Sequence, residues 1–125
     1  MNVAIALPAD VRAARALLAR GRRLAARFGA SWVALLVQTG PRERRAAGDL
    51  DQLVTSLGGE LRCTEGQDVA FSLIDLSERE HTDLLVIGAS RRPTLLRRFS
   101  IGTTEKLLRA SRSFHLVVAA AGADA

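Results

Sequence analysis

The chain alternates along its whole length between short apolar runs and segments whose apolar residues recur at helical spacing. Each apolar run is too short for a buried helix and therefore predicts a strand; the runs are residues 2–7, 31–38, 60–64, 83–88 and 114–119. The second run is apolar on both faces, which is typical of strands in parallel sheets that are covered on both sides. Strict alternation of strand and helix predicts a parallel sheet with helices on both faces and right-handed crossovers.

Four segments between these runs predict helices. Residues 10–28 place arginines on the side opposite to their apolar residues, as an amphipathic helix does. Residues 42–57 are helical in their later part, whereas 42–47 are weakly patterned and are interpreted as loop. Asp68 is a suitable N-cap for the third helix. Ser100 opens the fourth, after a long basic loop.

These elements predict an α/β domain with a three-layer, flavodoxin-like (Rossmann-like) fold. Placing the first strand at the centre gives a five-stranded parallel sheet of order 3-2-1-4-5. A chain of 125 residues forms one domain. We expect this domain to span residues 1–119, followed by a tail at 120–125.

Composition excludes several classes of protein. The single cysteine, Cys63, rules out an internal disulfide framework and a cysteine-cluster zinc site. Two histidines without paired spacing argue against a metal enzyme. No apolar run reaches about 18 residues, so the domain is not expected to span a membrane. The first residues do not have the pattern of a secretory signal, and we expect a cytoplasmic protein.

The charge is unevenly distributed along the chain. Residues 9–29 hold six arginines against Asp10, residues 63–87 hold one arginine against six acids, and residues 88–112 hold seven basic residues against one acid. The last block predicts a docking site for an acidic protein surface, a nucleotide or inner-leaflet lipid, because arginine forms bidentate contacts with phosphate and carboxylate. The candidates are Arg91, Arg92, Arg97 and Arg98. The alternative is a solvated loop. Nucleic acid is not expected as a partner, because aromatic residues are nearly absent from the block.

A ligand site is expected where the order of the strands reverses, outside the carboxyl ends of the first and fourth strands. The residues expected there are Pro8, Ala9, Asp10, Gly88, Ala89, Ser90 and Arg91. The start of the last helix, with Gly102, Thr103 and Thr104, adds free N–H groups and hydroxyls that suit an anion. The alternative is that the fold itself needs these glycines and hydroxyls. No catalytic residues are predicted, because Ser90 lacks the setting of a nucleophile.

The stretch Gly88-Ala-Ser-Arg-Arg-Pro, followed by Phe99-Ser-Ile-Gly-Thr-Thr104, resembles the loop of the universal stress protein family, and the likeness covers residues 2–119. In the nucleotide-binding members of that family the backbone of this loop holds ATP phosphates. The resemblance therefore implies ATP or another adenine nucleotide as the ligand, where one binds. Arg91 stands where the family has a second glycine, and Pro8 where it commonly has an acid, so nucleotide binding stays open.

Residues 23–39, 66–70 and 87–93 are similar to a narrower group, the cytoplasmic domain of KdpD-type potassium sensor histidine kinases. This resemblance implies a non-catalytic sensory and docking module in two-component potassium or osmotic signalling, with a protein partner at the basic loop. The alternative is a stand-alone, ATP-binding universal stress protein. A homodimer is a further expectation, because the fifth strand, 114–119, lies at an edge of the predicted sheet.

Overall fold

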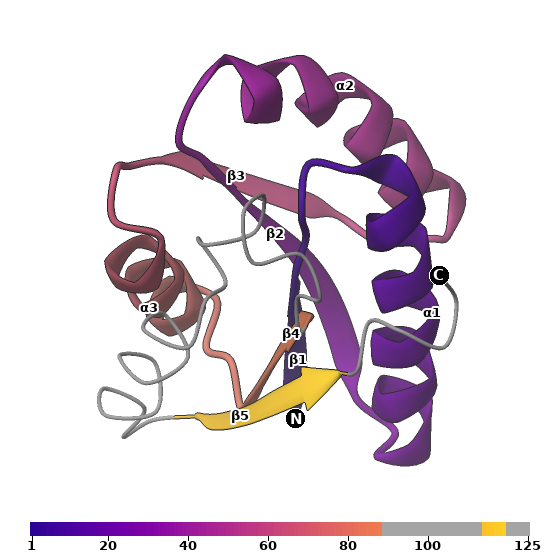
Figure 1. The fold of residues 1–125 in the computed structure, drawn as a ribbon. Helices are drawn as coiled ribbons and strands as arrows, with labels where there is room; N and C mark the ends of the chain where they lie inside the picture. Colours follow the sequence, from indigo (N-terminus) through magenta and orange to yellow (C-terminus); the bar gives the residue numbers. More distant parts are fainter. Residues whose placement is uncertain (89–113, 120–125) are drawn as a thin grey trace.

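The computed structural model describes residues 1–88 and 114–119, which form a sheet covered by helices on both faces (Figure 1). In chain order the elements are β1 (Asn2–Ala6), α1 (Val11–Arg27), β2 (Ser31–Gln38), α2 (Pro41–Ser56), β3 (Leu61–Glu65), α3 (Val69–Arg79), β4 (Leu84–Gly88) and β5 (His115–Ala119). The strands lie in the order β3-β2-β1-β4-β5, and every pair is parallel. The predicted fold class and strand order are therefore confirmed.

Alternate residues of the central strand point into two separate hydrophobic clusters. Val3 and Ile5 pack with α1 and α2 on one face, whereas Ala4 and Ala6 pack with α3 on the other. The period of two follows from the pleat of a strand. Both faces of β1 are fully covered, because residues 3–6 are at most 1% exposed. The sheet is thus the middle layer of three.

The first helix is held by its cap and by its apolar face. The Asp10 carboxylate accepts a hydrogen bond from the Arg12 backbone N–H at 3.0 Å, which satisfies one of the unpaired N–H groups of the first turn. Leu17 and Leu18 are buried against the sheet. The chain then turns through Gly29, whose φ of +59° lies in the left-handed region that favours glycine. The predicted helix is confirmed to within one residue at each end.

The second helix begins earlier than predicted. Residues 42–47 are helical, since α2 runs from Pro41 to Ser56, and their interpretation as loop was wrong. Proline at the first helical position has a suitable φ and lacks only an N–H that would be unpaired there. Ala46 and Ala47 are partly buried against the α1 side of the core. Side chains this small give little apolar pattern in the sequence, although they do pack.

The remaining elements follow the prediction closely. The Asp68 carboxylate accepts a hydrogen bond from the Phe71 backbone N–H at 3.0 Å, so its predicted role as the N-cap of α3 is confirmed. The strands β3 and β5 lie at the two edges of the sheet, as expected. None of the helices in the described ranges is long and apolar enough to cross a membrane. The helix predicted from Ser100 and the tail at 120–125 lie outside the described residues.

Candidate functional site

The structure brings together the described residues that were expected at the strand-order reversal. The pairing of Ile5 with Val86 extends to place Leu7 level with Gly88, at the carboxyl edge where β1 and β4 lie side by side. Pro8 and Ala9 follow directly and are partly buried. This is the edge at which open parallel sheets bind ligands.

The side chains after β1 leave little polar chemistry for a ligand. Pro8 and Ala9 have no polar side-chain atom, and the Leu7 N–H donates to the Leu35 carbonyl at 2.8 Å. The carboxylate of Asp10 is engaged by the backbone of α1 as an N-cap. Apart from the exposed carboxylate of Asp10, one oxygen of which caps α1, a ligand at this part of the edge would meet hydrocarbon and backbone groups.

Gly88 is not required by the packing of the described residues. A Cβ built at this position would lie 3.7 Å from Leu17 Cδ2, which is an ordinary contact distance. By contrast, a Cβ at Gly21 would lie 2.4 Å from Ile5 Cδ1, and a Cβ at Gly59 would lie 2.2 Å from the Trp32 ring. Close packing thus accounts for Gly21 and Gly59 but not for Gly88, where the absent side chain leaves the backbone accessible.

The other candidate residues lie outside the part of the chain that the structure describes. These are Ala89, Ser90, Arg91, Gly102, Thr103 and Thr104 of the expected anion site, and Arg91, Arg92, Arg97 and Arg98 of the expected docking loop. They remain predictions from the sequence.

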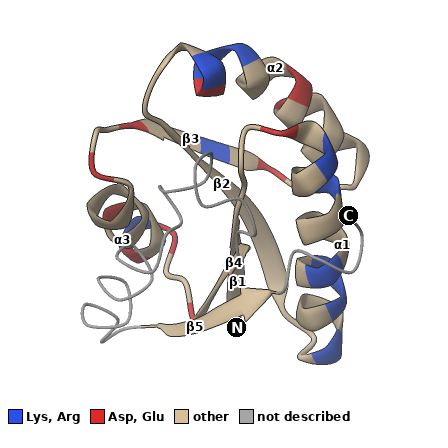
Figure 2. Cartoon of the chain, in the orientation of Figure 1, with Lys and Arg blue, Asp and Glu red and all other residues tan. Residues whose placement is uncertain are grey.

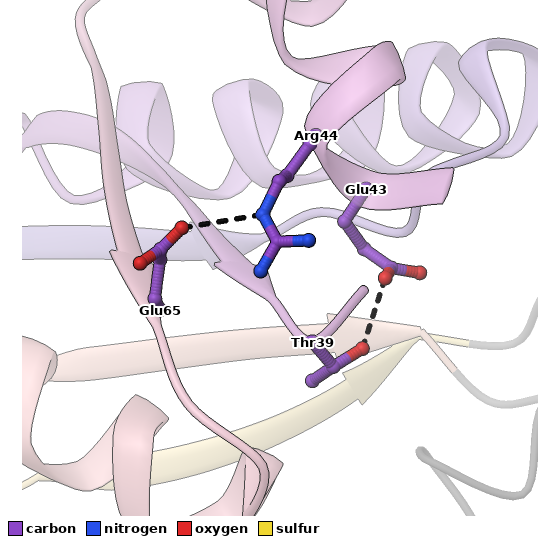
Figure 3. A network of polar contacts seen from close by, with 4 residues as sticks. All are labelled: Thr39, Glu43, Arg44 and Glu65. Atoms are coloured by element: carbon purple, nitrogen blue, oxygen red, sulfur yellow. Dashed lines mark hydrogen bonds and ion pairs between the residues drawn. The ribbon is translucent and has the colours of Figure 1, made fainter. Parts of the chain in front are cut away.

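A polar network that the sequence reasoning missed lies at the same edge of the sheet, between β2 and β3 (Figure 3). The Thr39 hydroxyl donates to Glu43 Oε1 at 2.9 Å, and Arg44 Nε donates to Glu65 Oε1 at 3.2 Å. Only 8% of Glu43 is exposed, whereas both side chains of the Arg44–Glu65 pair are more than half exposed. The exposed pair therefore contributes little to stability.

Glu43 is the unusual member of this network, because acidic side chains are rarely buried. It stands in the first turn of α2, where the helix dipole favours a negative charge. The signal in the sequence is an acid two residues after a proline that starts a helix. The weak apolar pattern of residues 42–47 hid that signal by making the segment look like a loop.

Trp32 and Cys63 are the tryptophan and the cysteine of the chain, and both lie in the described part of the sheet. Trp32 is partly buried against the α1 side of the core, and the Arg22 guanidinium lies over its ring at 5.9 Å from the centroid. Cys63 is exposed on the edge strand β3. Partial desolvation, together with the Asp51 carboxylate, raises the pKa of the Cys63 thiol, and a hydrogen bond with Gln38 opposes this. A raised pKa disfavours the reactive thiolate.

The described residues contain no clustered metal ligands. Within residues 1–88 and 114–119, no three His, Cys, Asp or Glu side chains are grouped so that they could hold a metal ion. His81 follows α3 with a φ of 53°, and its backbone carbonyl accepts a hydrogen bond from Asn2 Nδ2.

The fold is that of universal stress proteins. One solved structure, a universal stress protein in complex with cAMP, superposes with a TM-score of 0.66 at 18% identity and covers 95% of this chain and 96% of its own. A second, a putative universal stress protein from Pseudomonas aeruginosa, superposes with a TM-score of 0.70 at 15% identity and covers 94% of this chain and 47% of its own. No family model matches the sequence.

The sequence, in contrast to the fold, is similar to one particular kind of protein, a sensor protein. The chain is 34% identical over 96 residues to the sensor protein KdpD of Clostridium acetobutylicum. The match covers 69% of this chain but only 10% of the sensor protein. The chain is therefore a universal-stress-protein-like domain close to that of KdpD, and it spans about a tenth of the length of this relative.

Proposed function

We propose that the chain is a non-catalytic, cytoplasmic sensory and docking module of a KdpD-type osmosensitive potassium sensor histidine kinase. The observation that supports this most strongly is the 34% identity over 96 residues to a KdpD sensor protein. The module would act in two-component signalling by binding another protein, either a second domain of the kinase or a separate stress protein.

The described site supports binding more than it supports a reaction. At the carboxyl edge, the Asp10 carboxylate caps α1 and Glu43 accepts a hydrogen bond from Thr39. Docking would then be performed by the basic loop with Arg91, Arg92, Arg97 and Arg98. An adenine nucleotide at Gly88, Ser90, Gly102 and Thr103 would modulate that docking.

A chimeric kinase tests this proposal. The chain replaces the matching segment in full-length KdpD of C. acetobutylicum, and autophosphorylation is measured in vesicles over a range of K⁺ concentrations. We expect the chimera to retain its K⁺ response and R91S/R92S to reduce it. The control R42S/R45S removes the same charge from exposed positions of α2. A chimera without any K⁺ response, while the parent kinase responds, contradicts the proposal.

A second candidate function is a stand-alone universal stress protein that binds an adenine nucleotide. The observation in its favour is that the fold superposes on a universal stress protein solved in complex with cAMP, with a TM-score of 0.66. Calorimetric titration of the purified chain with ATP and Mg²⁺ distinguishes the two functions. Micromolar affinity favours the nucleotide-binding protein; no heat and no thermal shift favour the docking module.

A further inference from the structure

The surface of α1 is unusual because its exposed residues are arginines and alanines only. The exposed arginines are Arg12, Arg15, Arg22, Arg23 and Arg27, and the helix contains no acidic residue. Figure 2 shows basic residues along α1, in contrast to the acidic residues around α3 and the ends of β3. We call this surface the α1 arginine face. It runs along a helix of 17 residues, a length of about 25 Å.

The arginines are placed where they repel one another. Arg23 and Arg27 are separated by four residues, so they are neighbours on the helix surface, where like charges are destabilising. They line an open pocket together with Leu24 and Ala26. This arrangement costs stability in the isolated chain, and an anionic group bound in the pocket would remove that cost.

The described residues do not neutralise most of this charge. Arg44, Arg62 and Arg79, which lie elsewhere on the molecule, each form an ion pair with a carboxylate. Among the described residues, Arg12, Arg15, Arg23 and Arg27 have no such partner. The guanidinium of Arg22 is held over the Trp32 ring instead. These three ion pairs thus lie on elements other than α1.

The chemistry of the face selects among anionic partners. A helix that binds a lipid surface presents a row of large apolar side chains for insertion, whereas the leucines of α1 pack toward the core and the exposed positions within the helix are alanine and arginine. Phe28, the C-cap of α1, is the one large apolar side chain exposed beside this face among the described residues of α1 and its cap, and it is 55% exposed. Single-stranded nucleic acid binds on a series of aromatic side chains, whereas the aromatic residues beside this face are Phe28 at the end of the helix and Trp32, whose ring is covered by Arg22. Alanine lets the backbone of a partner approach closely, and guanidinium groups pair with carboxylates in a bidentate geometry.

We propose that the α1 arginine face docks an acidic polypeptide segment of a partner protein. Carboxylates of that segment would pair with Arg23 and Arg27, and its apolar atoms would contact Leu24 and Ala26 in the pocket between them. The residues of this face are different from those of the predicted basic loop at 91–98. The inference does not rest on the proposed function, because it concerns direct binding by the isolated chain.

Direct binding to a defined probe tests the proposal. The probe is a fluorescently labelled 20-residue peptide of glutamate and alanine, titrated with the purified chain at low and at physiological salt. The variant R23Q/R27Q removes two charges from the α1 arginine face, and R42Q/R45Q removes two from exposed positions of α2. Glutamine keeps helix propensity close to that of arginine, and thermal melts check that both variants are folded.

We expect the peptide to bind more weakly as salt rises, and R23Q/R27Q to weaken binding about tenfold, the effect of two partly exposed charge pairs. R42Q/R45Q is expected to weaken it less than about twofold, by its effect on net charge alone. Absence of peptide binding at low salt overturns the proposal. It is also overturned if R23Q/R27Q and R42Q/R45Q lose the same amount of affinity for the peptide. Binding of phosphatidylserine vesicles that is lost only in R23Q/R27Q, without binding of the peptide, also overturns it and assigns the face to lipid.

Discussion

Gly21 of α1 lies so close to Ile5 of β1 that a Cβ at residue 21 would be 2.4 Å from Ile5 Cδ1 and 2.6 Å from Ile5 Cγ1. Glycine in the middle of a helix normally lowers stability by about 1 kcal/mol relative to alanine. Here the missing side chain lets the helix approach the central strand closely.

Gly21→Ala is therefore predicted to destabilise the protein by about 1–2 kcal/mol, because overpacking outweighs the gain in helix propensity. Urea unfolding measures the free energy. The matched control is Gly48→Ala in α2, where nothing lies within 4 Å of the added Cβ among the described residues. The control is expected to stabilise by about 0.5–1 kcal/mol. A stabilised Gly21→Ala variant would contradict the close packing.

Gly88→Ala is predicted to leave stability unchanged within about 0.5 kcal/mol, since the added methyl group meets Leu17 at an ordinary distance of 3.7 Å. The same urea experiment measures the change. If an adenine nucleotide binds at this edge, the variant is expected to weaken its binding, because the methyl group would occupy space next to the backbone. A loss of more than about 2 kcal/mol would show that the fold itself requires glycine at this position.

Asp10→Ala and Asp68→Ala are each predicted to lower the free energy of unfolding by about 1 kcal/mol, the usual value of an N-cap. The two losses should add, because α1 and α3 pack on opposite faces of the sheet and share no contact residue in the two clusters. Asp49→Ala, at an exposed position of α2, serves as the control and should stay within about 0.5 kcal/mol. An Asp10→Ala variant with the same free energy of unfolding as the wild type would refute the role of Asp10 as an N-cap.

The Cys63 thiol is predicted to ionise at a higher pH in the folded protein than in the unfolded chain, because partial burial, aided by the Asp51 carboxylate, raises its pKa. The folded state therefore favours the protonated thiol. The stability from this group is fully present below the pKa of the unfolded chain and is lost as the pH rises through the folded pKa. Alkylation rates measured against pH, with and without urea, test this. If the pH midpoint of alkylation is the same with and without urea, the folded environment does not change the pKa of the Cys63 thiol.

A homodimer through β5 is predicted because this strand has an unpaired edge within the described sheet and carries Val118, which is 47% exposed. Light scattering is expected to give twice the mass of the chain. Val118→Lys should shift the mass toward that of the monomer, because a charge on an edge strand opposes pairing. A wild-type chain that is strictly monomeric at micromolar concentration would remove the prediction.

The sequence was most informative where local signals agreed with one another. The parallel sheet followed from the alternation of elements, and the strand order followed from placing the first strand at the centre. Asp68 was recognisable as a cap because an apolar helical pattern began directly after it. The start of α2 was missed because alanines that pack against a core look the same in a sequence as alanines in a loop. The contact between Thr39 and Glu43 was missed for the same reason, since it depends on where that helix begins.

The sequence alone determined the number and type of the described elements, because the hydrophobic period of each segment is a local property. It also determined that both faces of the central strand are apolar. Only the tertiary structure decided that Val3 and Ile5 face α1 and α2 while Ala4 and Ala6 face α3. It alone decided, too, that Gly21 serves close packing whereas Gly88 does not. Such assignments depend on distances between segments far apart in the chain, which no local pattern contains.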